Sequence, residues 1–212
     1  MDVEKVPEIK TAPAGRPWCS IGISLCAFLV WIFPASQKGF LYDRASIASG
    51  QWWRIWSGHL AHHGGSHLLW NLAVFLPAGI WLERRYPFCA RWFFAIAPLC
   101  VSLALLVFEP ALGLYAGLSG VTVGVVTLLG CLQLRNPGEP KWFWSAVLIS
   151  IAVKVAAEFM GHGSPFFAVL PSGIRNVPLA HLAGAGCAVI FFLIWTTKNA
   201  RRNPLSETSG GQ

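Results

Sequence analysis

Charged residues are scarce in this chain. Only 12% of its 212 residues are Asp, Glu, Lys or Arg, whereas soluble domains carry about a quarter. Hydrophobic residues make up 55% and lie in long blocks. This composition excludes an ordinary soluble domain and indicates a polytopic membrane protein. The formal net charge of +7 is therefore no sign of a nucleic-acid partner, because Lys and Arg gather between the apolar blocks.

Other common features are missing as well. The six cysteines form no CxxC pair and lie mostly inside apolar blocks, so we expect small buried hydrophobes, with no disulfide, metal site or cofactor. The start of the chain lacks the short apolar core and cleavage site of a secretory signal. No second domain and no repeat of fixed period is visible. A single membrane domain remains.

Six apolar blocks are long enough to be spanning helices. They cover 18–34, 67–83, 88–108, 117–134, 142–161 and 177–197. We expect an all-α membrane protein, a six-transmembrane-helix bundle over 18–197. A flexible cytoplasmic N-terminus, 1–17, precedes it, and a cytoplasmic tail, 198–212, follows. The connection 35–66 contains three crowded tryptophans, which favour the membrane–water boundary, so we expect it to lie in or on the interface.

Six spans place both termini on one side of the membrane. Eleven Lys and Arg fall on that side and four on the other, while Lys154 lies inside a span. Positive residues are retained in the cytoplasm. We therefore expect a multi-pass membrane protein with both termini in the cytoplasm.

This topology brings three polar residues to one depth. His67 opens the second span, Ser119 lies two residues into the fourth, and His181 lies about one turn into the sixth. All three spans begin at the outer face. Because ionisable residues in a bilayer usually face the bundle interior or a water cavity, we expect such a cavity just below the outer surface.

These residue types are typical of acyl transfer. A serine hydroxyl needs a base, and histidine is the usual one, so Ser119 and His181 are the candidate nucleophile and base. His67 and Asn71 share one helix face and, with the Ser119 backbone N–H, can form an oxyanion hole. No Asp or Glu is placed to orient His181, so we expect a dyad and not a triad.

Structural alternatives remain open for each residue. Gly117 and Gly120 flank Ser119, and small residues let helices approach closely, so Ser119 also fits a packing site. His67 and Asn71 also fit an interhelical hydrogen bond. His181, which precedes Gly184, equally fits a helix contact.

The remaining polar residues have structural alternatives too. Lys154 and Glu158 fit an intrahelical ion pair that lowers the cost of insertion. The functional alternative is a polar site that holds substrate or orders the loop 159–176. We expect His59 and His62 to pin the outer loop by hydrogen bonds.

Three more loop residues receive structural roles. Arg54 is expected to organise the outer loop, with a substrate clamp as the alternative. His63 and His162 are expected to be solvated.

Six ordered motifs resemble those of the rhomboid intramembrane serine proteases, over about 51–194. They are Trp53-Arg54, His62, His67-x3-Asn71, Glu83-Arg84, Gly117-x-Ser119-Gly120 and Ala180-His181-x2-Gly184. The resemblance implies that Ser119 is the nucleophile and His181 the base. It also implies His67, Asn71 and the Ser119 backbone N–H as oxyanion donors.

Within that family the chain looks most like the rhombosortase branch. It has no soluble appendage, a histidine-rich run from Gly58 to Leu72, and Lys154-x3-Glu158. This resemblance implies membrane-anchored substrates with a C-terminal tail: a Gly-Gly-type motif, one spanning helix and a basic end. It also implies an amine lipid as an acyl acceptor in place of water. Glycine weakens a helix by about 0.8–1 kcal/mol relative to alanine, so such a tail can unwind near Ser119.

Two other functions compete with a protease. One is a catalytically inactive rhomboid-like protein that binds membrane clients. The other is a small transporter, although no inverted repeat is visible. Covalent labelling of a serine separates the protease from both.

Overall fold

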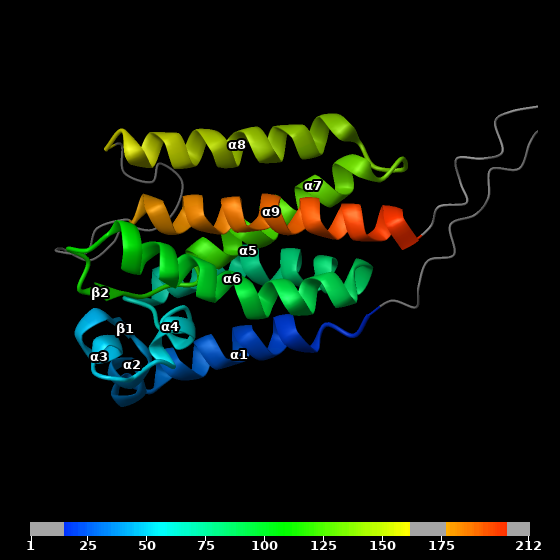
Figure 1. Ribbon diagram of the computed structural model, residues 1–212. Helices are drawn as coiled ribbons and strands as arrows, with labels where there is room; N and C mark the ends of the chain where they lie inside the picture. The colour runs from blue at the N-terminus through cyan, green and yellow to red at the C-terminus, as the bar shows by residue number, and fades with distance from the viewer. Residues whose placement is uncertain (1–14, 162–176, 203–212) are drawn as a thin grey trace, which may run out of the picture.

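The computed structural model describes residues 15–161 and 177–202. Helices dominate these residues, and Figure 1 shows the long ones side by side as a bundle. In chain order the described elements are α1 (Trp18–Ile32), α2 (Pro34–Phe40), β1 (Tyr42–Asp43), α3 (Arg44–Ala48), α4 (Arg54–Ser57), α5 (Gly65–Arg85), α6 (Pro87–Phe108), β2 (Leu114–Tyr115), α7 (Ser119–Arg135), α8 (Lys141–Phe159) and α9 (Pro178–Arg202). One long helix therefore covers most of each of the six predicted apolar blocks.

Four of these helices are long and apolar enough to cross a membrane: α5, α6, α8 and α9. The α1–α2 pair counts as a fifth candidate, although it bends by 117°. The bend follows from Pro34, which disfavours helical backbone at Phe33, where φ is −102° and ψ is 91°. The described residues thus show a multi-pass membrane protein with four or five candidate spans, where the sequence predicted six.

The central helix is α7, which has 17 residues. It contacts α5, α6, α8 and α9, and most of its side chains are buried. Three of its glycines face neighbouring helices so closely that a Cβ would lie within 3 Å of another heavy atom. The brevity of α7 reflects this position, because a helix enclosed by others need not match the thickness of a bilayer.

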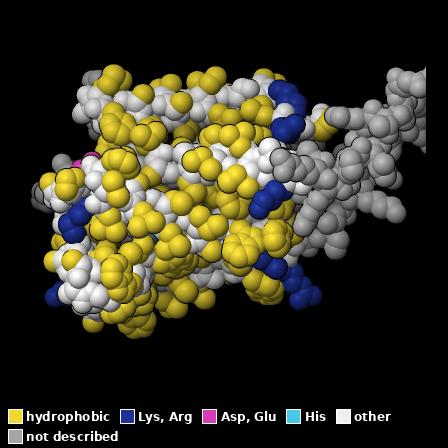
Figure 2. Space-filling model, in the orientation of Figure 1, with side chains coloured by type: hydrophobic (Ala, Val, Ile, Leu, Met, Phe, Trp, Pro, Cys, Tyr) yellow, Lys and Arg dark blue, Asp and Glu magenta, His cyan; other side chains and the backbone are white. Residues whose placement is uncertain are grey.

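The outer surface of the bundle is apolar. Figure 2 shows hydrophobic side chains over the middle of the molecule, with Lys and Arg towards its two ends. Large exposed side chains include Leu103, Ile149, Val153 and Ile190. An apolar belt with charged ends is what a bilayer requires of a protein that spans it.

The two described chain ends lie at the same end of the bundle (Figure 1). There the carboxylate of Glu83 accepts hydrogen bonds from the backbone of Cys19 and Ser20 and from the Ser20 hydroxyl. Glu83 therefore caps the first turn of α1.

The predicted boundaries shift slightly at both ends. Residues 1–14 of the expected flexible segment lie outside the described residues, and Gly15 N–H donates to the Arg84 carbonyl at 3.1 Å. At the other end α9 continues to Arg202, beyond the predicted boundary at 197.

The connection 35–66 folds against the opposite end of the bundle (Figure 1). It contains α2 to α4, and β1 pairs antiparallel with β2, with Tyr42 opposite Tyr115. Arg54 is only 7% exposed and donates to the carbonyls of Lys38 and Leu41 at 2.9 and 2.7 Å. Arg54 is therefore a loop organiser, as predicted. That this connection lies at a membrane interface stays a prediction.

Candidate active site

The N-terminal turns of α7 and α9 pack closely against each other. A Cβ added to Gly120 would lie 2.7 Å from the carbonyl oxygen of Ala180. One added to Gly124 would lie 2.8 Å from the carbonyl oxygen of Gly184. Ser119 precedes Gly120 and His181 follows Ala180, so this contact brings the two candidate catalytic residues to the same level of the bundle.

His67 belongs to the same region. A Cβ on Gly117 would lie 2.7 Å from Cε1 of the His67 ring, and Gly117 has a φ of +137°. The ring therefore rests on the turn that leads into Ser119. Its Nδ1 atom is buried and has no hydrogen-bond partner among the described residues. The prediction that α5 brings a histidine to Ser119 agrees with this placement.

Asn71 lies one turn further along α5 and is 6% exposed. Its Nδ2 donates to the His67 carbonyl at 3.0 Å. This bond lies within α5, so the interhelical bond considered from the sequence is not what the side chain makes here. One of the two amide protons is used, so the other can still donate a hydrogen bond.

His62 holds the turn before Ser119. Its Nδ1–H donates to the Leu60 carbonyl at 3.1 Å, and its Nε2 accepts from Leu118 N–H at 3.4 Å. Burial, with a smaller contribution from His67, lowers the pKa of His62 to about 3. The ring is therefore neutral at ordinary pH. His62 pins the loop, as predicted.

His59 pins the same connection to α6. Its Nε2 lies 3.0 Å from both the Pro98 carbonyl and the Ser102 hydroxyl, and Ser102 in turn donates to the Ile55 carbonyl. Burial lowers the pKa of His59 to about 4. The predicted structural role of His59 is thus confirmed.

The two remaining loop histidines differ in outcome. His63 is half-buried and its ring stacks on His67 with a centroid distance of 6.3 Å and an interplanar angle of 7°. His63, which was expected to be solvated, is therefore only partly exposed. His162 lies outside the described residues.

Tyr115 is a site residue that the sequence argument missed. Its hydroxyl donates to the Gly117 carbonyl at 3.0 Å, and the Ser119 side chain and Gly120 N–H approach the same hydroxyl oxygen. Burial raises the pKa of Tyr115 to about 12, so the hydroxyl is neutral at ordinary pH. The position four residues before Ser119 was the only available signal, and it does not show in which direction the ring points.

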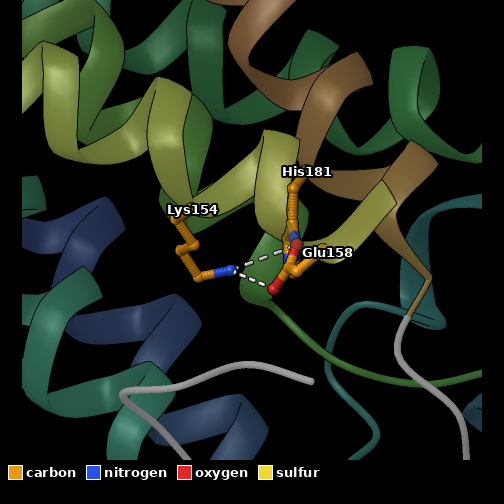
Figure 3. A network of polar contacts seen from close by, with 3 residues as sticks. All are labelled: Lys154, Glu158 and His181. Atoms are coloured by element: carbon orange, nitrogen blue, oxygen red, sulfur yellow. Dashed lines mark hydrogen bonds and ion pairs between the residues drawn. The ribbon is translucent and has the colours of Figure 1, made fainter. Parts of the chain in front are cut away.

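Glu158 contacts His181, although the sequence predicted that no carboxylate would. Its Oε2 lies 2.6 Å from His181 Nδ1, and its Oε1 accepts from Lys154 Nζ at 2.5 Å. Figure 3 shows Lys154 and Glu158 reaching from α8 towards His181 on α9. The predicted ion pair of Lys154 and Glu158 is confirmed. The prediction that no carboxylate reaches His181 is wrong, because i,i+4 spacing alone does not show towards which helix the pair turns.

The arrangement provides the elements of acyl transfer. Ser119 opens α7, and the first N–H groups of a helix have no partners within that helix, so they favour a developing negative charge. His181 supplies an imidazole at the level of Ser119. The alternative that Lys154 and Glu158 order the loop 159–176 concerns mainly residues 162–176, which lie outside the described residues.

Comparison with known proteins adds one match. A family model described as Rhomboid domain matches residues 49–197. None of the curated proteins compared with the chain matches it. The matched span contains every site residue described above.

Proposed function

The chain belongs to the rhomboid family, and from this premise we propose that it is an intramembrane serine protease. Ser119 is the nucleophile and His181 is the general base. The observation that carries the proposal is the contact of α7 and α9 at Gly120 and Ala180, which are the sequence neighbours of these two residues.

The proposed reaction proceeds through an acyl-enzyme. His181 Nε2 removes the proton from Ser119 Oγ as that oxygen attacks a peptide carbonyl. The Ser119 backbone N–H and the side chains of His67 and Asn71 stabilise the resulting oxyanion. The tetrahedral intermediate then collapses, and the leaving amine takes the proton from His181. Water or an amine later attacks the acyl-enzyme.

The proposed substrates are secreted or surface proteins anchored by a C-terminal tail, as in the rhombosortase branch. The tail contains a Gly-Gly-type motif, one spanning helix and a basic end. A spanning helix hides its carbonyls in backbone bonds, so a glycine-rich end that unwinds easily favours attack. The lipid bilayer itself then supplies an amine lipid as an alternative acceptor to water.

The proposed orientation puts Ser119 near the outer face of the inner membrane, with both termini in the cytoplasm. It requires that α1 and α7 complete six spans. Two features support it: the described chain ends lie at one end of the bundle, and Arg84, Arg85 and Arg135 end helices there.

The test is mass spectrometry of a co-expressed substrate that carries a Gly-Gly-type tail. We expect a new C-terminus with wild-type protein and none with Ser119→Ala. Ser150→Ala is the matched control, because Ser150 is an exposed serine of α8 whose hydroxyl, among the described residues, bonds only to the Ala146 carbonyl. A free carboxylate on the product means hydrolysis, whereas an added amine-lipid head group means acyl transfer. Cleavage that persists in Ser119→Ala would refute the proposal.

A further inference from the structure

Three charged or titratable side chains meet at the N-terminal end of α9. His181 Nδ1 lies 2.6 Å from Glu158 Oε2, Lys154 Nζ lies 2.5 Å from Glu158 Oε1, and Lys154 Nζ lies 3.3 Å from His181 Nδ1. The Glu158 side chain is 1% exposed and the Lys154 side chain 19%. Such a group inside a membrane protein is costly unless each charge is paired.

The contacts determine where the protons lie. A 2.6 Å separation between a nitrogen and an oxygen requires one proton between them. An ammonium donates only, so Lys154 keeps the Glu158 carboxylate ionised, and the shared proton belongs to His181 Nδ1. Lys154 Nζ and His181 Nδ1 are then both donors. Their 3.3 Å approach is imposed by the common carboxylate and is not a hydrogen bond.

From this geometry we infer that Glu158 is a positioning residue for His181. We also infer that the Lys154 ammonium, which can only donate, fixes the orientation of the side chain at position 158 by binding one of its oxygens. With the proton held on Nδ1, the lone pair of Nε2 is left to accept the proton of Ser119. The inference rests on the proposed protease function. It adds a third member to the pair that the sequence predicted.

The carboxylate also matters after proton transfer. The cluster of Lys154, Glu158 and neutral His181 has no net charge. When His181 takes the Ser119 proton, the imidazolium forms beside Glu158, which stabilises it. Lys154 opposes that positive charge but keeps Glu158 ionised.

The first test variant is Glu158→Gln, which keeps the shape of the side chain. The Lys154 ammonium attracts the amide oxygen, so the amide NH2 faces His181 Nδ1 and donates to it. Such a bond favours the His181 tautomer that has its proton on Nε2. In that tautomer Nε2 cannot accept the proton of Ser119. We expect labelling of Ser119 by a fluorophosphonate to slow by about 10³- to 10⁴-fold, as when the acid of a catalytic triad becomes an amide.

The second variant adds a change that restores the geometry. In Glu158→Gln/Lys154→Met no ammonium holds the amide oxygen, so the amide turns and accepts from His181 Nδ1–H. We expect labelling to recover by at least about tenfold over Glu158→Gln, because the charge-assisted hydrogen bond from Lys154, which held the amide in the unproductive orientation, is gone. A purely structural role predicts the opposite, because two lost contacts disturb a packed helix pair more than one.

The assay uses the full chain in detergent micelles and reports labelling rates. Ser119→Ala gives the background and Ser150→Ala the matched control on α8. If the wild-type protein is not labelled, the proposed protease function fails. If it is labelled through Ser119 but Glu158→Gln is labelled within about threefold of the wild-type rate, the positioning role fails and the protease function stands.

A measurement on the wild-type protein covers the case in which Glu158→Gln does not fold. The ¹⁵N spectrum of protein with labelled histidine, assigned with His181→Gln, reports the tautomer of His181 directly. We expect a protonated Nδ1 and an unprotonated Nε2 near neutral pH. The reverse tautomer would overturn the inference.

Discussion

The ring of His67 lies against Gly117, two residues before Ser119. A Cβ on Gly117 would approach the His67 Cε1 to 2.7 Å, and the φ of +137° is one that only glycine adopts readily. This contact links α5 to the turn that opens α7. The contact therefore fixes the position of His67, the candidate oxyanion donor, relative to Ser119, the candidate nucleophile.

Gly117→Ala is expected to lower both activity and stability. The backbone strain costs about 1–3 kcal/mol, and the new methyl group displaces His67. Fluorophosphonate labelling of Ser119 and the melting temperature in detergent measure the two effects. Gly113→Ala is the matched control in the same loop, since no described heavy atom lies within 4 Å of a Cβ there and its φ is not in the positive range. Equal behaviour of the two variants would contradict the proposed role of Gly117.

Gly184→Ala is expected to separate α7 from α9. A Cβ at Gly184 would overlap the Gly120 carbonyl, and backbone atoms cannot move aside as a flexible side chain can. We expect loss of Ser119 labelling and a lower melting temperature. Gly186→Ala on the same helix is the control, because a Cβ there meets no described heavy atom within 4 Å. Normal labelling of Gly184→Ala would show that the helix contact does not position Ser119 and His181.

Acidification is expected to destabilise the protein through His62. Its pKa falls from 6.5 to about 3 on burial, so between these values the unfolded chain binds a proton that the folded protein does not. The stability linked to His62 is complete above about pH 6.5 and is lost as the pH falls towards 3. Below that value no further loss arises from this ring.

The melting temperature between pH 7 and pH 4 measures this effect. His62→Gln keeps an acceptor for Leu118 N–H but no longer titrates, so its melting temperature should fall less over the same range. His59, whose pKa is about 4, acts in the same direction and remains in the variant. An equal fall in wild type and variant would exclude His62 as a source of acid sensitivity.

Tyr115→Phe is expected to slow labelling of Ser119 several-fold while the protein stays folded. The change removes a hydroxyl that the Ser119 side chain and Gly120 N–H approach, and a net hydrogen bond is worth about 0.5–1.5 kcal/mol. Tyr42→Phe is the matched control in the paired strand, because the Tyr42 hydroxyl has no partner among the described residues. If Tyr42→Phe slowed the labelling of Ser119 and Tyr115→Phe did not, the Tyr115 hydroxyl would have no role at the site.

The sequence predicted the position of the helices and the candidates at their ends. A chain in lipid must satisfy its backbone groups internally, so each long apolar block becomes a helix. Pro34 marked the end of α1, and glycines around Ser119 marked a close helix contact. The structural roles of Arg54, His59 and His62 also followed, because polar side chains in a long aromatic loop need partners.

The contact of Glu158 with His181 was decided by tertiary structure alone. Lys154 and Glu158 lie on one face of α8 by their spacing, but the direction of that face depends on how α8 rotates against α9. In a soluble protein an apolar stripe would fix this rotation. Here α8 is apolar on nearly every side, and the preference of charged residues for the bundle interior turns Lys154 and Glu158 away from lipid without selecting the helix that they meet. Only side-chain packing places Glu158 against His181.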